Sequence, residues 1–469
     1  MKSSGTLSVL TRARARSNRR NLLAGTGEGI LAMPWAFLSL PGNFILAALL
    51  TQVYRLDTAT YGLIASLPAW GNAVQIFIMP WLSRFLTPKE LALGMGWFNV
   101  GLWSVFAAVL PYLPVGRNGG AAELFFAFFL LASMSLSFAS VGWTSWVKDW
   151  VPSRVRGRYF GVRNRWLNLS TVVFLLLALA LFEVDEHALW PYQVLIGAAV
   201  AMRFGGIIWQ YAIRTPAEHF ETPGRSWAHD VRENLASRDL VRFIVFAAWV
   251  SFWIGFVGPF LPVFSFEELG MQPGAFSILV ILSTVSGIFG WWFWGRRVDH
   301  HGCVPVLFLG LLLWEVPSYL WVFIGPGTVW LLYPLWFFGG FFATAYFAAS
   351  FNLLLKLVPH GSKLAGVSLH LAVTSVAAAV APVLAGVLLS FFIEAGSGLA
   401  AYRVGFAVKS TALLAGLFLL RGLREPQRSS RTSLPGAFRT LRQLLATQGA
   451  SFLASLTPQK SRRQDRGSR

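Results

Sequence analysis

Charged residues are scarce in this chain. Asp, Glu, Lys and Arg together make up 13% of its 469 residues, whereas a soluble globular protein carries about 25%. Hydrophobic residues make up 55%, and 40 Phe and 21 Trp are among them. This composition excludes an ordinary soluble protein and predicts a chain that lies largely in lipid.

Cysteine is nearly absent as well, because Cys303 is the only one. A single thiol excludes an intrachain disulfide and a metal site built from several thiolates. The chain also lacks a Walker loop, an H-E-x-x-H pair and a G-x-S-x-G in a strand–turn–helix context. The run "DHH" at 299–301 is a poor metal site, because three adjacent residues cannot all reach one ion. We therefore expect no enzymatic activity, no metal and no cofactor, and without a nucleotide-binding domain the chain alone cannot pump with ATP.

Long apolar stretches, in contrast, are abundant. About 20 residues at a rise of 1.5 Å each cross a hydrocarbon core of about 30 Å. Twelve stretches are long enough, and Pro34, Pro41 and Pro382 predict kinks in the first and eleventh. The stretches cover residues 22–52, 60–81, 91–113, 122–146, 166–184, 190–213, 240–264, 274–294, 304–325, 328–353, 365–393 and 399–421.

Cations gather on one side of these spans. Of the 39 Lys and Arg, 34 lie in the two terminal tails and in the loops after even-numbered spans, against three (Arg55, Arg117 and Arg403) on the other side. The positive-inside rule therefore predicts that both termini are cytosolic. The basic run "KDWVPSRVRGRYFGVRNR" at 148–165 is first of all such an anchor. Clamped between two spans, it lacks the basic face on a compact domain that nucleic-acid binding requires.

The two halves of the chain share several sequence patterns. "YGLIASLPAWGNAVQIFIMPWLSR" (61–84) shares its size pattern with "FSILVILSTVSGIFGWWFWGRRVD" (276–299), and "RTP" after span 6 parallels "REP" after span 12. Two six-span halves in the same orientation are typical of a transporter with a site at the bilayer midplane.

The repeat suggests a division of the chain. The basic start "MKSSGTLSVLTRARARSNRR" is not followed by a short apolar core with a cleavage site, so we expect a retained tail rather than a secretory signal. From residue 435 the C-terminal tail is either an amphipathic interfacial helix or a disordered basic segment. We predict a cytosolic tail (1–21), a six-helix bundle (22–213), a cytosolic linker (214–239), a second six-helix bundle (240–424) and a basic cytosolic tail (425–469).

Two loop motifs carry a family resemblance. "GRRVDHHG" (295–302) after span 8 resembles the G-x-x-x-D-x-x-G signature of the major facilitator superfamily. Asp149 followed by Arg156-Gly157 is similar to the acid-x6-Arg-Gly element that facilitators carry after span 4, and "RGRYFGVRNR" resembles a bacterial subgroup of that family. The resemblance implies an all-α integral membrane fold of 12 transmembrane helices in two pseudo-symmetric bundles.

The chain also departs from the family pattern. Residues 80–90, "PWLSRFLTPKE", lack the Asp and the second Gly of the signature, and the loop after span 10 has no Arg-Gly. Span 5 lacks the Gly-Pro-rich motif of drug/proton antiporters, of which only "APVLAG" (381–386) in span 11 is a fragment. These departures count against an efflux role without excluding it.

The two motifs predict a gate at the cytosolic ends. Carboxylates opposite arginine forks make directional but breakable contacts, worth about 0–1 kcal/mol when exposed. We expect Asp149 to pair with Arg156 or Arg158, and Asp299 to pair with Arg296, Arg297 or Lys363, in the outward-open state. The alternative is that these charges only anchor topology and solvate loops. The predicted gating residues are Asp149, Arg156, Arg158, Gly295, Arg296, Arg297, Asp299 and Gly302.

Five ionisable residues lie within the predicted spans. A bare charge at the bilayer centre costs at least about 2.5–3.5 kcal/mol, so each should be paired or face a cavity. Spans 1, 4, 7 and 10 line the central path in the family, so Glu28 is either a proton-coupling carboxylate or a salt-bridge partner of Arg203. For Glu315 and Lys409 we favour a mutual structural ion pair. His370 is either a helix-end histidine or a proton relay.

Aromatic and amide side chains on the predicted spans are candidates for substrate binding, because they combine stacking with directional hydrogen bonds. For each of them, ordinary packing is the competing interpretation. The candidates are Asn43, Gln75, Trp143, Trp249, Trp253, Tyr346 and Asn352.

Together these features predict a secondary transporter that moves a small organic solute by alternating access, with protons as the favoured coupling ion. We expect a monomer whose partners are the solute, membrane lipids and protons, with no nucleic acid. A facilitator-like sensor, or a scaffold that holds a lipid or pigment without transport, is the alternative.

Overall fold

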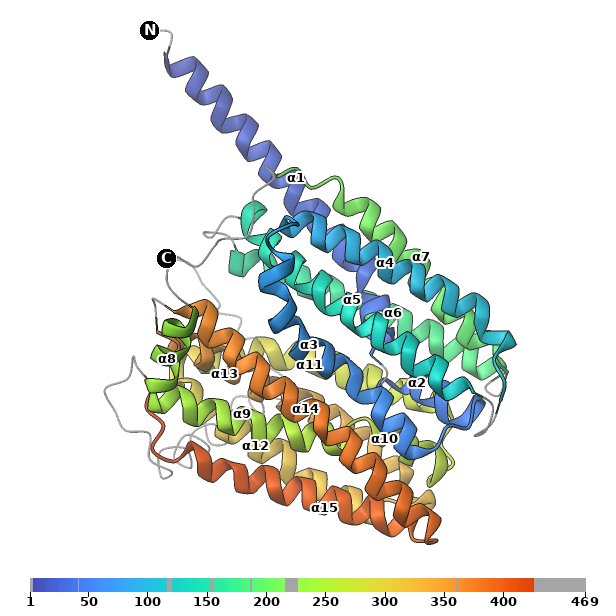
Figure 1. Ribbon diagram of the computed structural model, residues 1–469. Helices are drawn as coiled ribbons and strands as arrows, with labels where there is room; N and C mark the ends of the chain where they lie inside the picture. Colours follow the sequence, from blue (N-terminus) through green and yellow to red (C-terminus); the bar gives the residue numbers. More distant parts are fainter. Residues whose placement is uncertain are drawn as a thin grey trace, which may run out of the picture.

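The computed structural model describes residues 3–40, 42–115, 120–151, 156–185, 188–215, 227–359 and 362–425. Within these ranges the side chains of residues 3–17, 156–158, 227–228 and 363–364, and those of Pro80 and Lys148, lie outside the description. Every regular element in the described part of the chain is helical (Figure 1).

The first half of the chain runs through helices α1 to α7, some of which end in short 3₁₀ or π-helical turns. Their bounds are α1 (Ser3–Leu38), α2 (Phe44–Ala48) with the π-helical turn Leu49–Val53, α3 (Thr58–Leu82), α4 (Pro88–Val109) with the 3₁₀ turn Leu110–Tyr112, α5 (Ala121–Trp150), α6 (Arg156–Val184) and α7 (Trp190–Gln210).

The second half follows the short helix α8 (Trp227–Ala236), which lies within the segment predicted as a linker. The remaining bounds are α9 (Arg238–Val257), α10 (Phe260–Glu267), α11 (Pro273–His301), α12 (Cys303–Ser318) with the 3₁₀ turn Tyr319–Phe323, the 3₁₀ turn Pro326–Leu331 before α13 (Leu332–Leu357), α14 (Lys363–Glu394), and α15 (Gly398–Gly416) with the 3₁₀ turn Leu417–Leu420.

Local sequence signals set several helix ends. Thr87 and Glu90 form a capping box at the start of α4, with Pro88 in the first turn, where its missing N–H costs nothing. The side chain of Asp57 accepts a hydrogen bond from the Thr60 N–H at the start of α3. Gly302 separates α11 from α12 with a φ of 85°, a left-handed conformation that a residue with a side chain rarely adopts.

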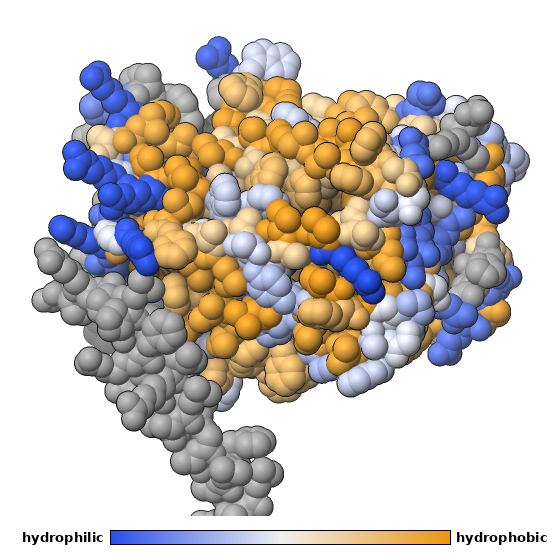
Figure 2. Space-filling model, turned by 90° about the horizontal axis from the view of Figure 1, so that it is seen from below, coloured by the Kyte–Doolittle hydropathy of each residue, from blue (hydrophilic) through white to orange (hydrophobic). Residues whose placement is uncertain are grey.

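Eleven helices of the described residues are long and apolar enough to cross a membrane, and they overlap eleven of the twelve predicted stretches with ends that differ by up to seven residues. Figure 2 shows the corresponding apolar surface between two hydrophilic ends. The exception is the first stretch, predicted as one span over 22–52. The structure breaks it between Leu38 and Phe44, whereas Pro34 and Pro382 remain inside α1 and α14.

Asn43 accounts for this break. Its side-chain oxygen accepts hydrogen bonds from the backbone N–H groups of Ile45 and Leu46, and its Nδ2 donates to the carbonyl of Leu38 over 2.9 Å. One amide therefore caps the end of α1 and the start of α2, replacing hydrogen bonds that a continuous helix would make.

The helix contacts repeat between the two halves. Within the first half α4 packs on α5, α3 on α5, α1 on α6 and α7, and α4 on α7. Within the second half the equivalent helices pack in the same way: α12 on α13, α11 on α13, α9 on α14 and α15, and α12 on α15. Between the halves, α3 packs on α14 and α6 packs on α11. The repeat maps one of these contacts onto the other, because α3 corresponds to α11 and α6 corresponds to α14. The fold is the predicted pair of pseudo-symmetric bundles.

The bundle has two unlike ends. We call the end that carries α8, the start of α1 and the described end of the chain at Glu425 the terminus end; α1 projects beyond the other helices there (Figure 1). The opposite end, which carries α2, α10 and the start of α3, is called the far end.

Apolar packing differs between these ends. At the far end one buried cluster includes residues of both halves, among them Phe44, Phe182, Phe264 and Phe276. At the terminus end the buried clusters of the described residues stay within one half each: one is formed by the second half, and two smaller ones by the first. Among the buried apolar clusters of the described residues, the far-end cluster is thus the one that joins the two halves.

Candidate functional site

A buried carboxylate lies among four helices of the first half. Glu28 of α1 is 2% exposed. Its Oε1 lies 2.9 Å from Nη2 of Arg163 (α6) and accepts a hydrogen bond from Nε1 of Trp143 (α5) over 3.1 Å, while its Oε2 accepts one from Nε2 of Gln210 (α7) over 2.9 Å. These four residues form what we call the Glu28 cluster.

Glycines in the stretch "GTGEG" (25–29) make room for this cluster. A Cβ on Gly29 would lie 2.4 Å from Nη2 of Arg163, and one on Gly25 would lie 2.1 Å from the Trp150 ring. The Arg163 guanidinium also donates from Nε to the Gly25 carbonyl over 3.0 Å and lies 4.8 Å from the centre of the Trp143 ring. The absence of side chains on α1 thus lets an arginine reach the carboxylate inside the bundle.

The ion-pair partner of Glu28 is therefore Arg163, and the pairing with Arg203 proposed from the sequence is wrong. Arg203 lies seven residues before Gln210 on α7, about 10 Å along the helix. There its guanidinium lies 4.9 Å from the centre of the Trp35 ring. Arg163 escaped the sequence analysis because span 5 was expected to begin at 166, whereas α6 begins at Arg156, so Arg163 was counted as a loop cation.

The second half contains a different buried pair. Nζ of Lys409 (α15) lies 2.8 Å from both carboxylate oxygens of Glu315 (α12), which is fully buried and also accepts a hydrogen bond from Ser410 over 2.9 Å. The pair expected from the sequence is thus present, and it links two outer helices of the second half.

His370 of α14 stacks on Phe243 of α9, with ring centroids 5.5 Å apart and an interplanar angle of 4°. Its Nδ1 is buried and has no hydrogen-bond partner among the described residues. The contact links two neighbouring helices of the second half, and His370 lies apart from the Glu28 cluster.

The predicted gating residues are only partly described. Asp149 is exposed at the end of α5, but the side chains of Arg156, Arg158 and Lys363 lie outside the described residues. Asp299 is exposed on α11, between Gly295, where a Cβ would meet nothing within 4 Å, and Gly302 at the helix end.

Among these described residues, Asp299 forms no ion pair with Arg296 or Arg297 in this structure, whereas the pairing predicted from the sequence concerns the outward-open state. Arg296 lies 4.4 Å from the centre of the Trp292 ring, and Arg297 lies 3.2 Å from that of Phe293. Both arginines reach back to the aromatic ring four residues earlier, because helical side chains point toward the N-terminus of their helix. This direction takes their charges away from Asp299.

Sequence reasoning missed a polar contact at the same end of the molecule. Oε1 of Glu425 lies 2.7 Å from Nζ of Lys356 (α13), and its Oε2 accepts a hydrogen bond from the Cys303 N–H over 2.9 Å. Burial alone would raise the pKa of Glu425, but the hydrogen bonds from Lys356 and Cys303 outweigh burial and hold this pKa below its ordinary value. The sequence analysis noted "REP" at 424–426 only as part of the repeat and did not predict that Glu425 makes this contact.

The seven substrate candidates do not gather in one place. Asn43 caps the helix break, Trp143 belongs to the Glu28 cluster, and Asn352 donates to the Ala348 carbonyl of its own helix over 2.8 Å. Trp249 donates to the Ala412 carbonyl over 2.7 Å. Packing or capping therefore explains these four.

Of the other three candidates, Tyr346 and Trp253 pack against aromatic rings and Gln75 is buried. Tyr346 is buried beside Phe246 and Trp314. Trp253 packs on Trp249 with ring centroids 5.9 Å apart. The buried Nε1 of Trp253 and Oε1 of Gln75 have no hydrogen-bond partner among the described residues. Gln75 and Trp253 are therefore the candidates with a buried polar atom that lacks a hydrogen-bond partner among the described residues.

The contact between the halves at the far end, which we call the far-end seal, is short and specific. The Tyr61 hydroxyl of α3 donates to the Pro259 carbonyl over 2.9 Å, and the rings of Phe44 and Phe276 lie 5.5 Å apart. A Cβ on Gly62 would lie 2.4 Å from the Pro382 carbonyl oxygen, and one on Gly386 would lie 2.9 Å from that of Thr58. Two glycines thus let α3 and α14 cross at backbone contact.

In the described part of the chain, no three His, Cys, Asp or Glu side chains come together as a metal site. The arrangement instead offers what a solute carrier needs. It has two similar bundles, a closed contact at one end, and buried charges that are neutralised inside each bundle.

Comparison with known proteins gives the same picture. A family model described as Major Facilitator Superfamily matches residues 30–290 and 241–458. No curated protein matches the chain.

Three solved structures illustrate the shared fold. A bacterial homologue of the human lysosomal transporter Spinster, inward-facing and unoccupied, is 15% identical over 87% of this chain and 94% of its own, with a TM-score of 0.60. The nucleoside transporter NupG is 14% identical over 86% and 99%, with a TM-score of 0.62. A bacterial homologue of the iron transporter ferroportin, inward-facing, is 13% identical over 86% and 99%, with a TM-score of 0.63. Identities this low establish a common fold and leave the solute open.

Proposed function

This chain belongs to the major facilitator superfamily, and from that premise we propose that it is a secondary transporter that moves a small organic solute by alternating access. Membership makes it a multi-pass membrane transporter rather than an enzyme. We further propose that both termini lie in the cytosol, because 34 of its 39 Lys and Arg lie on that side of the predicted spans. We propose the inner membrane of a bacterium, because "RGRYFGVRNR" resembles a bacterial subgroup of the family.

The observation that carries the mechanism is the unequal packing of the two ends. Apolar residues of both halves share one buried cluster at the far end, while the clusters of the described residues at the terminus end each belong to one half. Such an arrangement is one state of a cycle in which two rigid bundles rock about a central site. With the termini in the cytosol, it corresponds to the inward-open state.

The gating proposal fits the same state. If Asp149 and Asp299 contact cations when the cytosolic ends meet, a state open at that end is not expected to contain those pairs. Asp149→Ala should then shift the balance of states toward inward-open, which raises the labelling of cytosolic-side cysteines. An unchanged balance would leave these carboxylates as topological anchors only.

The solute we propose is small, organic and not highly charged. The described spans bring no dense acidic or basic lining together, since Glu28, Glu315, Arg163 and Lys409 neutralise each other in pairs. Gln75 and Trp253 remain with a free amide oxygen and a free indole N–H. Such groups recognise a solute by stacking and directional hydrogen bonds.

We propose the proton as the coupling ion and Glu28 as the carboxylate that takes it up. Protonation of Glu28 would remove its ion pair with Arg163 and weaken the link between α1, α5, α6 and α7. Proton occupancy would thereby change the packing of the helices that surround the proposed path.

A screen followed by a flux measurement tests the proposal. Purified protein is first heated with members of a metabolite library, because a ligand that binds the folded state raises its stability by mass action, by about 2.7 kcal/mol at 100 times its Kd. The stabilising solute is then offered to proteoliposomes with and without an imposed pH gradient. Transport predicts accumulation that the gradient drives and that Glu28→Gln uncouples.

Other outcomes separate the alternatives. Flux that ignores the pH gradient would remove proton coupling but keep transport. A ligand that stabilises the protein yet never crosses the bilayer would indicate the second interpretation, a facilitator-like sensor or a scaffold for a lipid or pigment.

A further inference from the structure

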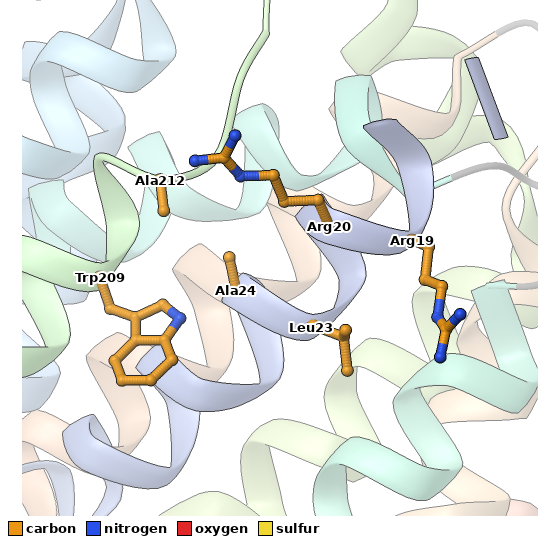
Figure 3. Close-up of a pocket in the computed structure, with 6 residues that line it drawn as sticks. All are labelled: Arg19, Arg20, Leu23, Ala24, Trp209 and Ala212. Carbon is orange, nitrogen blue, oxygen red and sulfur yellow. The ribbon is translucent and has the colours of Figure 1, made fainter. Parts of the chain in front are cut away.

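A hollow of about 470 Å³ opens between α1 and α7 at the terminus end. Arg19, Arg20, Leu23, Ala24, Trp209 and Ala212 line it (Figure 3). It lies on the outside of the first half, and none of the predicted gating, coupling or substrate residues is among these six.

The two arginines of the hollow have no partner in the described part of the chain. Both are exposed, and neither forms an ion pair, a hydrogen bond or a contact with an aromatic ring there. Arg163 and Arg203 of the same bundle, in contrast, lie against a carboxylate or an indole ring. Within the part of the chain that the structure describes, Arg19 and Arg20 therefore present two positive charges without a partner.

The rest of the hollow is apolar, and its two large side chains are exposed. Leu23 is 63% exposed and Trp209 is 49% exposed, and two small alanines lie between them. The apolar surface continues along α7 through Ile208 and Phe204, which are 52% and 48% exposed. An occupant of the hollow must therefore combine negative charge with an apolar part.

The depth of the hollow is that of a membrane interface. Trp209 is the last residue but one of the apolar span Trp190–Gln210, and tryptophan at the end of a span marks the level of the lipid headgroups. Figure 3 shows Arg20 reaching across Ala212, with the Trp209 ring on the same side of α1, while Arg19 points to the other side. Arg20 thus lies where a headgroup would meet both α1 and α7.

We propose that this hollow binds an anionic phospholipid, with its phosphate at Arg20 and its glycerol and upper acyl chain against Trp209, while Arg19 adds positive charge from the other side of α1. Arginine forks suit phosphate oxygens, and basic hollows between transmembrane helices on the cytosolic side bind anionic headgroups. The lipid would link α1 to α7 close to the Glu28 cluster, because Gly27 lies under the Trp209 ring, where a Cβ would be 2.9 Å from it. The proposal stands independently of transport.

Native mass spectrometry of the full chain tests it, with phosphatidylglycerol and phosphatidylcholine of equal chain length as probes. The wild-type protein should retain phosphatidylglycerol in preference to phosphatidylcholine. An interfacial arginine contributes up to about fivefold, so Arg19→Ala/Arg20→Ala should weaken phosphatidylglycerol binding by more than about fivefold and at most about 25-fold, with the larger share from Arg20. Arg165→Ala, which removes an exposed arginine of α6 with no partner in the described part, serves as the matched control and should change little.

Three results would overturn the proposal: equal retention of both lipids, equal loss in the double variant and the control, or displacement of the lipid by millimolar inorganic phosphate, which would indicate a free-anion site. If the double variant fails to fold, Arg20→Lys and Arg20→Gln give the same test. The lysine should retain part of the preference for phosphatidylglycerol and the glutamine should lose it.

Discussion

Two side chains decide what Glu28 can do. Arg163 supplies the charge and Gln210 the second hydrogen bond, so both carboxylate oxygens are occupied inside the bundle. Removing one partner of a buried ion pair leaves the other charge uncompensated, which typically costs about 3–5 kcal/mol. The pair is therefore a stability element as well as the proposed coupling site, and the two roles separate by experiment.

Glu28→Ala should lower the thermal stability of the purified protein strongly, by about 3–5 kcal/mol, because Arg163 is left buried and unpaired. The double variant Glu28→Gln/Arg163→Gln should lose less stability than the sum of the losses in Glu28→Gln and Arg163→Gln measured singly. Unfolding curves in detergent measure both. Glu123→Gln, which changes an exposed carboxylate of α5, is the control and should stay near wild type. Additive losses would show that the pair does not act as a unit.

A second residue-scale prediction concerns acid stability. The pKa of Glu425 is lowered in the folded protein, where burial is outweighed by hydrogen bonds from Lys356 and Cys303. Its contribution to stability is thus complete above the unfolded carboxyl pKa of about 4.3 and is lost as the pH falls through the lower folded value. The stability measured by thermal unfolding should fall more steeply for wild type than for Glu425→Gln as the pH is lowered from about 5 to about 3. Parallel curves would contradict this.

The sequence was informative about these residues to different degrees. Glu315 and Lys409 are opposite charges inside outer spans, so their pairing followed from the cost of a bare charge in lipid. Arg163 was missed because α6 begins ten residues earlier than the apolar run, and the helix start depends on tertiary packing rather than on hydropathy. Arg296 and Arg297 point away from Asp299 because helical side chains lean toward the N-terminus of their helix. The short spacing of these residues in the sequence does not show that direction.

At the scale of helices, the crossing of α3 and α14 depends on two glycines. A side chain on Gly62 would meet the Pro382 carbonyl, and one on Gly386 would meet that of Thr58. Helices approach this closely only where small residues lie at the contact. The state that is closed at the far end therefore requires Gly62 and Gly386.

Gly62→Leu should force the far ends apart and expose residues that the seal buries. Maleimide labelling of Ala385→Cys, at a position that is 1% exposed, measures this exposure. The native Cys303 is buried, so we expect it to contribute no labelling. Overpacking costs about 1–3 kcal/mol, so maleimide labelling of Ala385→Cys should rise at least about fivefold. Gly197→Leu, where a Cβ meets nothing within 4 Å, is the control. Equal labelling of both would remove the close crossing from the account.

Hydropathy located most helices well, because a span must be long and apolar whatever it packs against. It failed at the first span, where Asn43 hydrogen-bonds the ends of two helices. The sequence alone does not show that an amide within an apolar run caps a helix, because the cap forms only where the chain bends at that residue. Helix neighbours such as α3 and α14 also lie far apart in sequence, and only the repeat between the halves suggested that their contacts would match.

At the scale of the molecule, membrane orientation is the most direct prediction. Arg84 is exposed at the terminus end and Glu123 is exposed at the far end. In intact cells a membrane-impermeant maleimide should label Glu123→Cys and leave Arg84→Cys unlabelled until the cells are permeabilised. The reverse pattern would overturn the cytosolic placement of the termini and turn the proposed inward-open state into an outward-open one.

The far-end seal forms where the first helix of each half is interrupted. The break after Leu38 and the break after Val257 face each other, with Gly42 against Pro259 and the Tyr61 hydroxyl on the Pro259 carbonyl. When the halves separate there, the hydroxyl loses its acceptor and the carbonyl loses its donor. In the open state, the Tyr61 hydroxyl and the Pro259 carbonyl would thus offer a passing solute one hydrogen-bond donor and one acceptor at the entrance to the path.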